Sequence, residues 1–301
     1  MKLAVFLELI EAKAKTASVF PFLLGSLYAF YTYGKLNLIA LSIYFIAMLL
    51  FNCFVDAWDN YNDFHHAHDV EDYKVNTNII GREKIPEKTM VRLLGFLFFT
   101  SFALGLVVAW MTGWPVFWIG LGCYAVGIFY SGGPHPLSRL PFGEVLSGVT
   151  MGFLIVLLSV FINVSEQFSW DFTTIQRIFE VSLPSVLLIA NLMLANNTSD
   201  LEEDRRNHRY TLVHYIGKKH AVTLWVVAVI SAYVFLLHAA LVGITPILMV
   251  GNLFTIPFVY LLMKPYVLEQ KKQTTFLASV KILALLSFTQ VLFFLLGIIL
   301  R

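Results

Sequence analysis

Two short stretches of this sequence carry closely spaced carboxylate and carboxamide side chains. The first, residues 52–72, reads NCFVDAWDNYNDFHHAHDVED and directly follows an apolar run. Four of its side chains fall at spacings of four, three and four residues: Asn52, Asp56, Asp59 and Asp63. At these spacings they share one face of a helix. So much negative charge beside an apolar run needs a positive partner, and we favour a divalent cation that holds a phosphate group.

A second stretch, residues 196–211, repeats this pattern about 140 residues later with the letters NNTSDLEEDRRNHRYT. Asn196, Asp200 and Asp204 are again four residues apart, at the end of an apolar run. Mg²⁺ favours one or two carboxylates together with phosphate oxygens and water, so two such clusters suit Mg²⁺ and a diphosphate. Two solvated acidic loops, with an aspartate that caps a helix, would contain the same residues and remain an alternative.

Basic residues follow each acidic cluster and could clamp phosphate oxygens, although membrane topology alone would also place lysine and arginine there. These residues are Lys74, Arg82 and Lys84 in the first stretch and Arg205, Arg206 and Arg209 in the second. Three histidines of the first stretch could instead bind a transition metal, but histidines in a polar loop are more often solvated: His65, His66 and His68. We expect the intervening aromatic residues to pack or to lie at the membrane interface: Phe54, Trp58 and Tyr61.

The composition is that of a membrane protein with many spans. Of the 301 residues, 58% are hydrophobic and 13% are charged, with a mean hydropathy of +0.75. A soluble protein carries about a quarter charged residues. The net charge of +2 gives no argument for nucleic acid as a partner. Cys53 and Cys123 lack CxxC spacing, so neither a disulfide framework nor a zinc motif is predicted, and the N-terminal residues lack the cleavage site of a signal peptide.

A membrane-spanning helix needs about 20 mostly apolar residues, and nine segments approach this length. We therefore predict an all-α integral membrane protein with nine transmembrane helices that form a single domain, residues 1–301. Residues 165–180 are expected to form an amphipathic connector and residues 264–275 a polar linker. The nine predicted spans are residues 17–33, 36–58, 91–111, 115–130, 145–163, 181–197, 221–241, 245–263 and 276–300.

The distribution of lysine and arginine predicts the orientation of these spans. With the N-terminus inside, the inner segments carry 17 of these residues and the outer segments carry 3. Such an excess is typical of cytoplasmic loops. We therefore expect a multi-pass protein of the cell membrane, with both acidic stretches on the cytoplasmic side, where they can converge on one site.

These motifs resemble those of the UbiA superfamily of membrane prenyltransferases. Residues 196–212, with Asp200-x-x-x-Asp204, are similar to the second aspartate motif of that family. The first motif, usually written N-x-x-x-D, fits two registers. Asp59 and Asp63, with Asp69 downstream, fit one register, in which Asp59 replaces the usual asparagine. The other register has the literal letters a helix turn or two deeper in the span: Asn52 and Asp56.

A third stretch resembles one branch of the family. Residues 130–134 (YSGGP) and 141–144 (PFGE) are similar to the YTGGP…PxGE signature of the 1,4-dihydroxy-2-naphthoate polyprenyltransferases. Its glycines and prolines allow a tight turn at the end of a span. Residues 21–25 resemble the first-helix pattern of the family, but the usual Arg-Pro before them is missing, and Lys13 or Lys15 could substitute.

The resemblance implies transfer of a polyprenyl group from a polyprenyl diphosphate to an aromatic acceptor, through an allylic carbocation and without a covalent enzyme intermediate. The acceptor would be 1,4-dihydroxy-2-naphthoate, with 4-hydroxybenzoate or protohaem as alternatives. An ion-coupled transporter is the rival interpretation from another class. The implied Mg²⁺ ligands are Asp59, Asp63, Asp69, Asp200 and Asp204, and all but Asp69 are also expected to be catalytic, together with Tyr130. The implied substrate-binding residues are Asn52, Asp56, Lys74, Arg82, Arg139, Asn196, Asn197 and Arg205.

Overall fold

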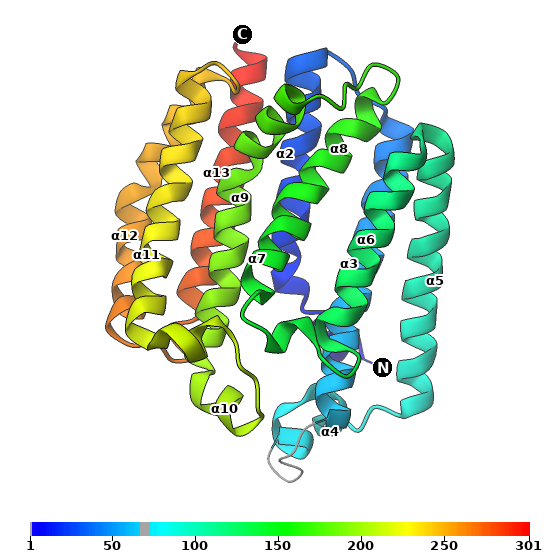
Figure 1. Ribbon diagram of the computed structural model, residues 1–301, viewed down its shortest axis with the longest axis vertical. Helices are drawn as coiled ribbons and strands as arrows, with labels where there is room; N and C mark the ends of the chain where they lie inside the picture. Colours follow the sequence, from blue (N-terminus) through cyan, green and yellow to red (C-terminus); the bar gives the residue numbers. More distant parts are fainter. Residues whose placement is uncertain (1, 67–72) are drawn as a thin grey trace. The chain divides into compact units, whose positions relative to one another are not determined.

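The computed structural model describes residues 2–66 and 73–301, and within them every regular element is a helix. Figure 1 labels these helices along the chain. Eight helical segments of this part of the chain are long and apolar enough to cross a membrane. Exposed apolar side chains such as Trp110 and Phe254 suit helices that face lipid. The prediction of an all-α membrane protein is therefore confirmed.

The ninth predicted span is not among these eight segments. Residues 17–33 do form a helix, α2 (Thr16–Tyr33), but it has only 18 residues and includes tyrosine, threonine and serine side chains. The helix of residues 114–131 has the same length and is among the eight, so the polar side chains of α2, not its length, set it apart. The count of nine spans therefore stays a prediction.

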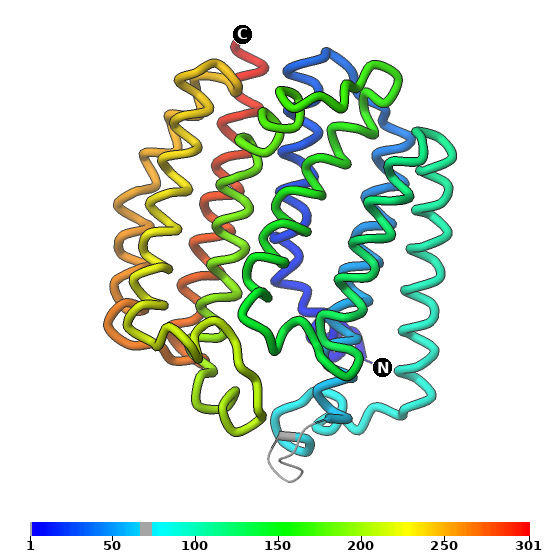
Figure 2. The backbone as a smooth tube through the Cα atoms, in the orientation of Figure 1, coloured from blue at the N-terminus to red at the C-terminus, as the bar shows by residue number. Residues whose placement is uncertain are grey.

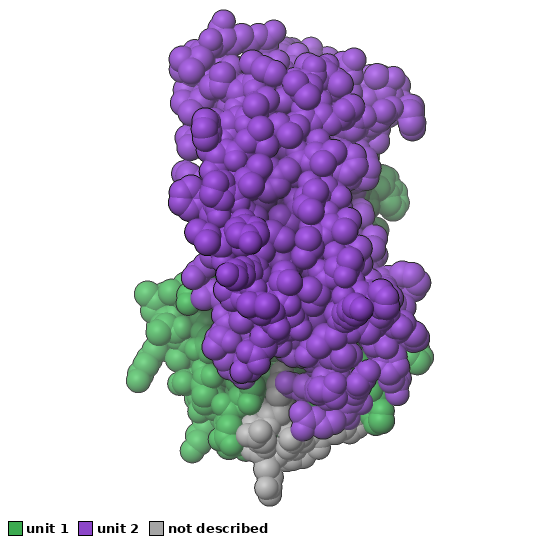
Figure 3. Space-filling model, turned by 90° about the vertical axis from the view of Figure 1, so that its left-hand side faces the viewer, with its two compact units in different colours: residues 1–15, 39–140, 207–209 green, residues 16–38, 141–206, 210–301 purple. Residues whose placement is uncertain are grey.

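The chain divides into two compact units, which are coloured in Figure 3. Unit 1 comprises residues 1–15, 39–140 and 207–209, and unit 2 comprises residues 16–38, 141–206 and 210–301. The helices of unit 1 are α1 (Leu3–Leu9), the 3₁₀ helix η1 (Ala12–Lys15), α3 (Leu38–His66), the π-helix η2 (Tyr73–Thr77), α4 (Ile79–Arg82), α5 (Glu87–Thr112), α6 (Trp114–Ser131) and the 3₁₀ helix η3 (Leu137–Arg139).

The core of unit 1 forms where aromatic residues of α3 meet α5 and α6. Phe54 is buried and packs against Phe98 of α5, with ring centroids 5.3 Å apart. Phe51 stacks on Tyr124 of α6 at 3.9 Å. These contacts confirm that Phe54 packs in the interior, and they fix α3 in position along the span.

Unit 2 contains the remaining helices, in which α9 packs against α11. Asn191 of α9 donates to the backbone oxygen of Trp225 of α11 at 3.0 Å, and both residues are buried. These elements are α2, α7 (Gly143–Ser147), the π-helix η4 (Gly148–Leu154), α8 (Ile155–Val164), α9 (Phe172–Ser199), α10 (Leu201–Arg206), α11 (Leu212–Leu241), the 3₁₀ helix η5 (Ile247–Thr255), α12 (Ile256–Leu268) and α13 (Leu277–Ile299).

Four helices continue beyond their predicted spans by five residues or more, and one of them is α11, which begins nine residues early at Leu212. α3 runs to His66 and so includes the polar residues whose spacing already placed them on one helix, and α9 begins at Phe172, inside the predicted connector. α12 continues to Leu268, inside the predicted linker. Hydropathy marks only the part of a helix that faces lipid, whereas polar residues extend the same hydrogen-bonded helix into water.

Candidate functional site

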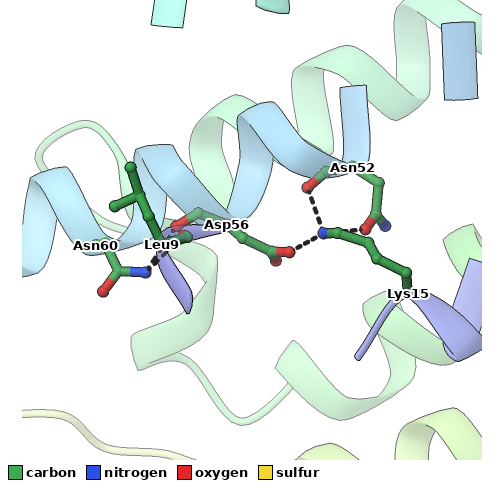
Figure 4. Close-up of polar contacts among 5 residues, drawn as sticks. All are labelled: Leu9, Lys15, Asn52, Asp56 and Asn60. Atoms are coloured by element: carbon green, nitrogen blue, oxygen red, sulfur yellow. Dashed lines mark hydrogen bonds and ion pairs between the residues drawn. The ribbon is translucent and has the colours of Figure 1, made fainter. Parts of the chain in front are cut away.

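Lys15 holds together the first two polar residues of the first motif. Its ammonium group donates to Asn52 Oδ1 at 2.5 Å and to the Asn52 backbone oxygen at 3.2 Å, and it forms an ion pair with Asp56. Figure 4 shows this group between the two side chains, which lie one helical turn apart on α3. The Lys15 side chain is 12% exposed, so the pair lies in a largely enclosed position.

The second motif has the same arrangement in the other unit. The ammonium group of Lys272 donates to Asn196 Oδ1 and lies 2.5 Å from Asp200 Oδ2. Lys272 belongs to the segment between α12 and α13, and its side chain is 42% exposed. In both units, therefore, one cation from a separate segment contacts an amide oxygen and a carboxylate oxygen four residues apart.

The remaining aspartates of the motifs lie further along each helical segment. Asp59 and Asp63 follow on α3, where both are half-buried, and Asp59 interacts electrostatically with Asp63 and Arg209. Asp204 lies on α10 and is only 4% exposed. Figure 2 shows the chain turning from α9 into α10. Asp69 and His68 fall outside the described residues.

The donor chemistry of both motifs fits Mg²⁺. Within residues 2–66 and 73–301, no group of three or more His, Cys, Asp or Glu side chains could hold a metal ion, and this includes His65 and His66 at the end of α3. Each N-x-x-x-D pair instead offers two oxygen atoms that already bind a cation, the lysine ammonium group. Mg²⁺ binds oxygen ligands, needs one or two protein carboxylates and completes its shell with phosphate oxygens and water.

The basic residues that were predicted to bind the diphosphate contact other protein side chains in this structure. Arg82 pairs with Glu8 at 2.6 Å, and this hydrogen bond raises the pKa of the guanidinium above its usual value. Arg205 pairs with Glu202 at 3.2 Å on the surface. Lys74 lies over an aromatic ring, 5.9 Å from its centroid. Contacts of these three side chains with a diphosphate stay a prediction.

The YSGGP signature lies at the end of α6 and supports the first motif helix. Trp58 donates from its indole nitrogen to the backbone oxygen of Ile128 at 3.0 Å. A Cβ at Gly132 would lie 2.9 Å from that indole nitrogen, so only glycine fits beside it. Gly133 has a φ of +85°, which favours glycine in the following turn. Gly133 therefore serves the turn, whereas Gly132 allows α6 to approach α3 closely. Two predicted site residues lie on either side of this turn: Tyr130 in α6 and Arg139 in η3.

The PFGE part of the signature supports the second motif helix. Asn197 donates to Glu144 Oε1 at 2.9 Å, and both side chains are buried. Asn197 directly follows Asn196, so this bond between α7 and α9 holds the second motif at its N-terminal end. Substrate binding by Asn197 stays a prediction, because the structure engages its side chain in this internal contact.

Sequence reasoning missed one residue of the site and gave no role to another. The sequence predicts Lys15 only as a substitute for a missing arginine, and it assigns no role to Lys272. Lys272 lies 72 residues from Asp200 in sequence, so spacing contains no signal for their contact. Glu144 belongs to the PFGE signature without an assigned function, and the signal available was a carboxylate directly before the predicted apolar span of residues 145–163.

Comparisons with known proteins show the family of this chain. A model of the UbiA prenyltransferase family matches residues 18–285. The 1,4-dihydroxy-2-naphthoate octaprenyltransferase of Bacillus subtilis (strain 168) is 32% identical over 241 residues, which are 78% of this chain and 73% of that protein.

Solved structures show the same fold. A UbiA homologue from Aeropyrum pernix K1 matches with a TM-score of 0.68 at 14% identity, over 97% of this chain and 98% of that chain. A UbiA homologue from Archaeoglobus fulgidus bound to GPP and Mg²⁺ matches with a TM-score of 0.65 at 13% identity, over 98% and 99% of the two chains. At these identities the likeness concerns the fold alone.

Proposed function

Because the chain belongs to the UbiA prenyltransferase family, we propose that it transfers a polyprenyl group from a polyprenyl diphosphate to 1,4-dihydroxy-2-naphthoate. The observation that carries the choice of acceptor is the 32% identity to the Bacillus subtilis enzyme. Residues 130–134 and 141–144 support the same choice, since they follow the signature of that branch. Family membership also decides against the transporter interpretation.

The first motif works in the register of Asn52 and Asp56. Lys15 joins these two residues just as Lys272 joins Asn196 and Asp200 in the second motif. Each pair would hold a Mg²⁺ ion, which when bound neutralises the charge that grows on the departing diphosphate. Asp59 and Asp63 then follow the first pair on α3, and Asp204 follows the second pair on α10.

The chemistry requires no nucleophile from the protein. The bond between the allylic carbon and the diphosphate oxygen breaks, and its electron pair leaves with the diphosphate. The electron-rich naphthoate ring forms a new carbon–carbon bond to the allylic cation, and the acid loses carbon dioxide and a proton. The protein binds the charged end of the donor at its polar helix ends, while the prenyl tail suits the apolar spans.

Both motifs are expected to lie on the cytoplasmic side of the cell membrane. The asymmetry of lysine and arginine between inner and outer segments supports this topology. His65→Cys and Asn207→Cys, each in a chain whose Cys53 and Cys123 are replaced by serine, test it with a thiol reagent that does not cross the membrane. Both thiols should react from the same side, and labelling from opposite sides would contradict the shared location.

The activity itself is tested with the purified full chain in liposomes and a radiolabelled polyprenyl diphosphate. We expect Mg²⁺-dependent formation of a prenylated naphthoquinol from 1,4-dihydroxy-2-naphthoate, and loss of the product with EDTA. 4-Hydroxybenzoate serves as the comparison acceptor in the same assay. A higher kcat/KM for 4-hydroxybenzoate, or full activity in excess EDTA, would overturn the proposal.

A further inference from the structure

The same three-residue arrangement occurs independently in two units of the protein. Each lysine ammonium contacts one amide oxygen and one carboxylate oxygen of an N-x-x-x-D pair. We propose that Lys15 and Lys272 are internal placeholder cations, which occupy the metal-binding oxygens of the two motifs until a divalent metal ion displaces them. This inference rests on the proposed function, because it takes the N-x-x-x-D pairs to be the metal ligands.

The charge and hydrogen-bonding capacity of lysine suit this role. An ionised carboxylate near the apolar part of a membrane protein is costly without a counter-ion, and removal of one partner of such a pair is destabilising. An ammonium group offers three donors and no acceptor, so it can contact the amide and the carboxylate oxygen together. A lysine in this position therefore keeps the two ligand atoms of each motif facing the same cation.

The location of both lysines allows them to leave. Neither belongs to the helix that carries its motif: Lys15 ends η1, and Lys272 lies between α12 and α13. The flexible four-carbon stem of lysine can swing away without a change in the motif helix. Lys15 is the more enclosed of the two, with 12% of its side chain exposed against 42% for Lys272, so its release should change accessibility more.

Metal and ammonium compete for the same oxygen atoms, and this competition gives a measurable signature. Without any prenyl diphosphate, Lys15→Met and Lys272→Met should each bind Mn²⁺ more tightly than the wild type, on the order of tenfold, because a charge-assisted hydrogen bond no longer opposes the metal. Mn²⁺ binding is read by electron paramagnetic resonance of the full chain in detergent.

A neighbouring lysine provides a matched control for the change in charge. Lys271 lies beside Lys272 and pairs with Glu269 at 2.9 Å. Lys271→Met removes the same charge without removing a motif contact, so its Mn²⁺ affinity should stay within about twofold of the wild type. Equal gains in the control and test variants, or unchanged or weaker binding in Lys15→Met and Lys272→Met, would overturn the inference.

A second measurement uses the wild-type protein and does not depend on whether the variants fold. Lysine acetylation by a water-soluble reagent is followed by mass spectrometry, with and without Mg²⁺. Lys15 and Lys272 should react faster when Mg²⁺ is present, while Lys271 serves as the unchanged internal reference. Equal or slower reaction of both lysines with Mg²⁺ would overturn the placeholder role.

The assay of prenyl transfer on the same samples separates the two proposals. Transfer to the naphthoate without any Mg²⁺ effect on lysine reactivity would defeat the placeholder role and leave the proposed function intact. Mg²⁺-dependent exposure of both lysines without prenyl transfer would support metal displacement and defeat the proposed function.

Discussion

The two N-x-x-x-D motifs use the same three side chains on different local structures. The first lies within the continuous helix α3, and the second spans the end of α9, where Asp200 is the C-cap residue before α10. The second motif still forms one helical turn, because the Asp200 backbone nitrogen donates to the Asn196 backbone oxygen at 3.0 Å. The common requirement is thus a single turn that aligns an amide with a carboxylate, together with a cation from another segment.

The supports of the two motifs also differ in kind. The first motif helix is held by a close approach, where Trp58 lies against the glycine at position 132. The second is held by a buried hydrogen bond from Asn197 to Glu144. Packing therefore holds the first motif helix and a hydrogen bond holds the second, so a variant can disturb one support without the other.

Replacement of the paired aspartates should have the largest effect. Asp56→Asn and Asp200→Asn should each slow prenyl transfer on the order of 100-fold or more, because each removes the carboxylate of its pair. Asp59→Asn should stay active and serves as the matched control on the same helix face. Steady-state rates against Mg²⁺ concentration provide the measurement. An active Asp56→Asn beside an inactive Asp59→Asn would show that the register of Asp59 and Asp63 is the working one.

Glu144 should come next, as a positioning residue of the second motif. Glu144→Leu leaves the Asn197 amide without its buried acceptor, which should lower the free energy of unfolding by about 1–3 kcal/mol. The rate of prenyl transfer should fall about tenfold, since a misplaced metal pair loses part of the stabilisation of the transition state. Glu144→Gln keeps an acceptor and should restore most of both properties. Equal loss in the two variants would contradict a role through this hydrogen bond.

Gly132 tests the support of the first motif by packing. Gly132→Ala places a methyl group against Trp58 and should destabilise the protein by about 1–3 kcal/mol, as overpacking does. The Mg²⁺ concentration needed for half-maximal activity should also rise, because α3 carries Asn52 and Asp56. Gly95→Ala is a suitable control, since no atom lies within 4 Å of a Cβ built there. Thermal unfolding in detergent compares the two variants, and equal midpoints would contradict the packing role of Gly132.

Loss of a surface ion pair should have the smallest effect on stability in both units. Arg82 pairs with Glu8 in unit 1 and Arg205 with Glu202 in unit 2, and both arginines are more than a third exposed. Arg82→Ala and Arg205→Ala should each change the free energy of unfolding by less than about 1 kcal/mol. If these arginines also bind the diphosphate, as the sequence predicts, the KM for the donor should rise without loss of stability. A large drop in the unfolding midpoint would show that these pairs hold the fold.

The sequence predicted the helical class and both motifs because their signals are local. Hydrophobic runs mark spans, and the spacing of Asn52 and Asp56 or of Asn196 and Asp200 marks one face of one turn. It did not predict that α9 begins at Phe172, inside the expected connector, since polar residues extend a helix without a hydropathy signal. The contact of Lys15 with Asn52 joins residues 37 positions apart, so only the folded chain reveals it.

The most direct test of the account counts the metal ions bound at each motif. The full chain is loaded with Mn²⁺ and a non-hydrolysable prenyl diphosphate analogue, freed of excess metal and analysed for bound manganese. The account predicts two ions for each wild-type chain, one for Asp56→Asn, one for Asp200→Asn and two for Asp59→Asn. Two ions in Asp56→Asn together with one in Asp59→Asn would contradict the equivalence of the two N-x-x-x-D pairs.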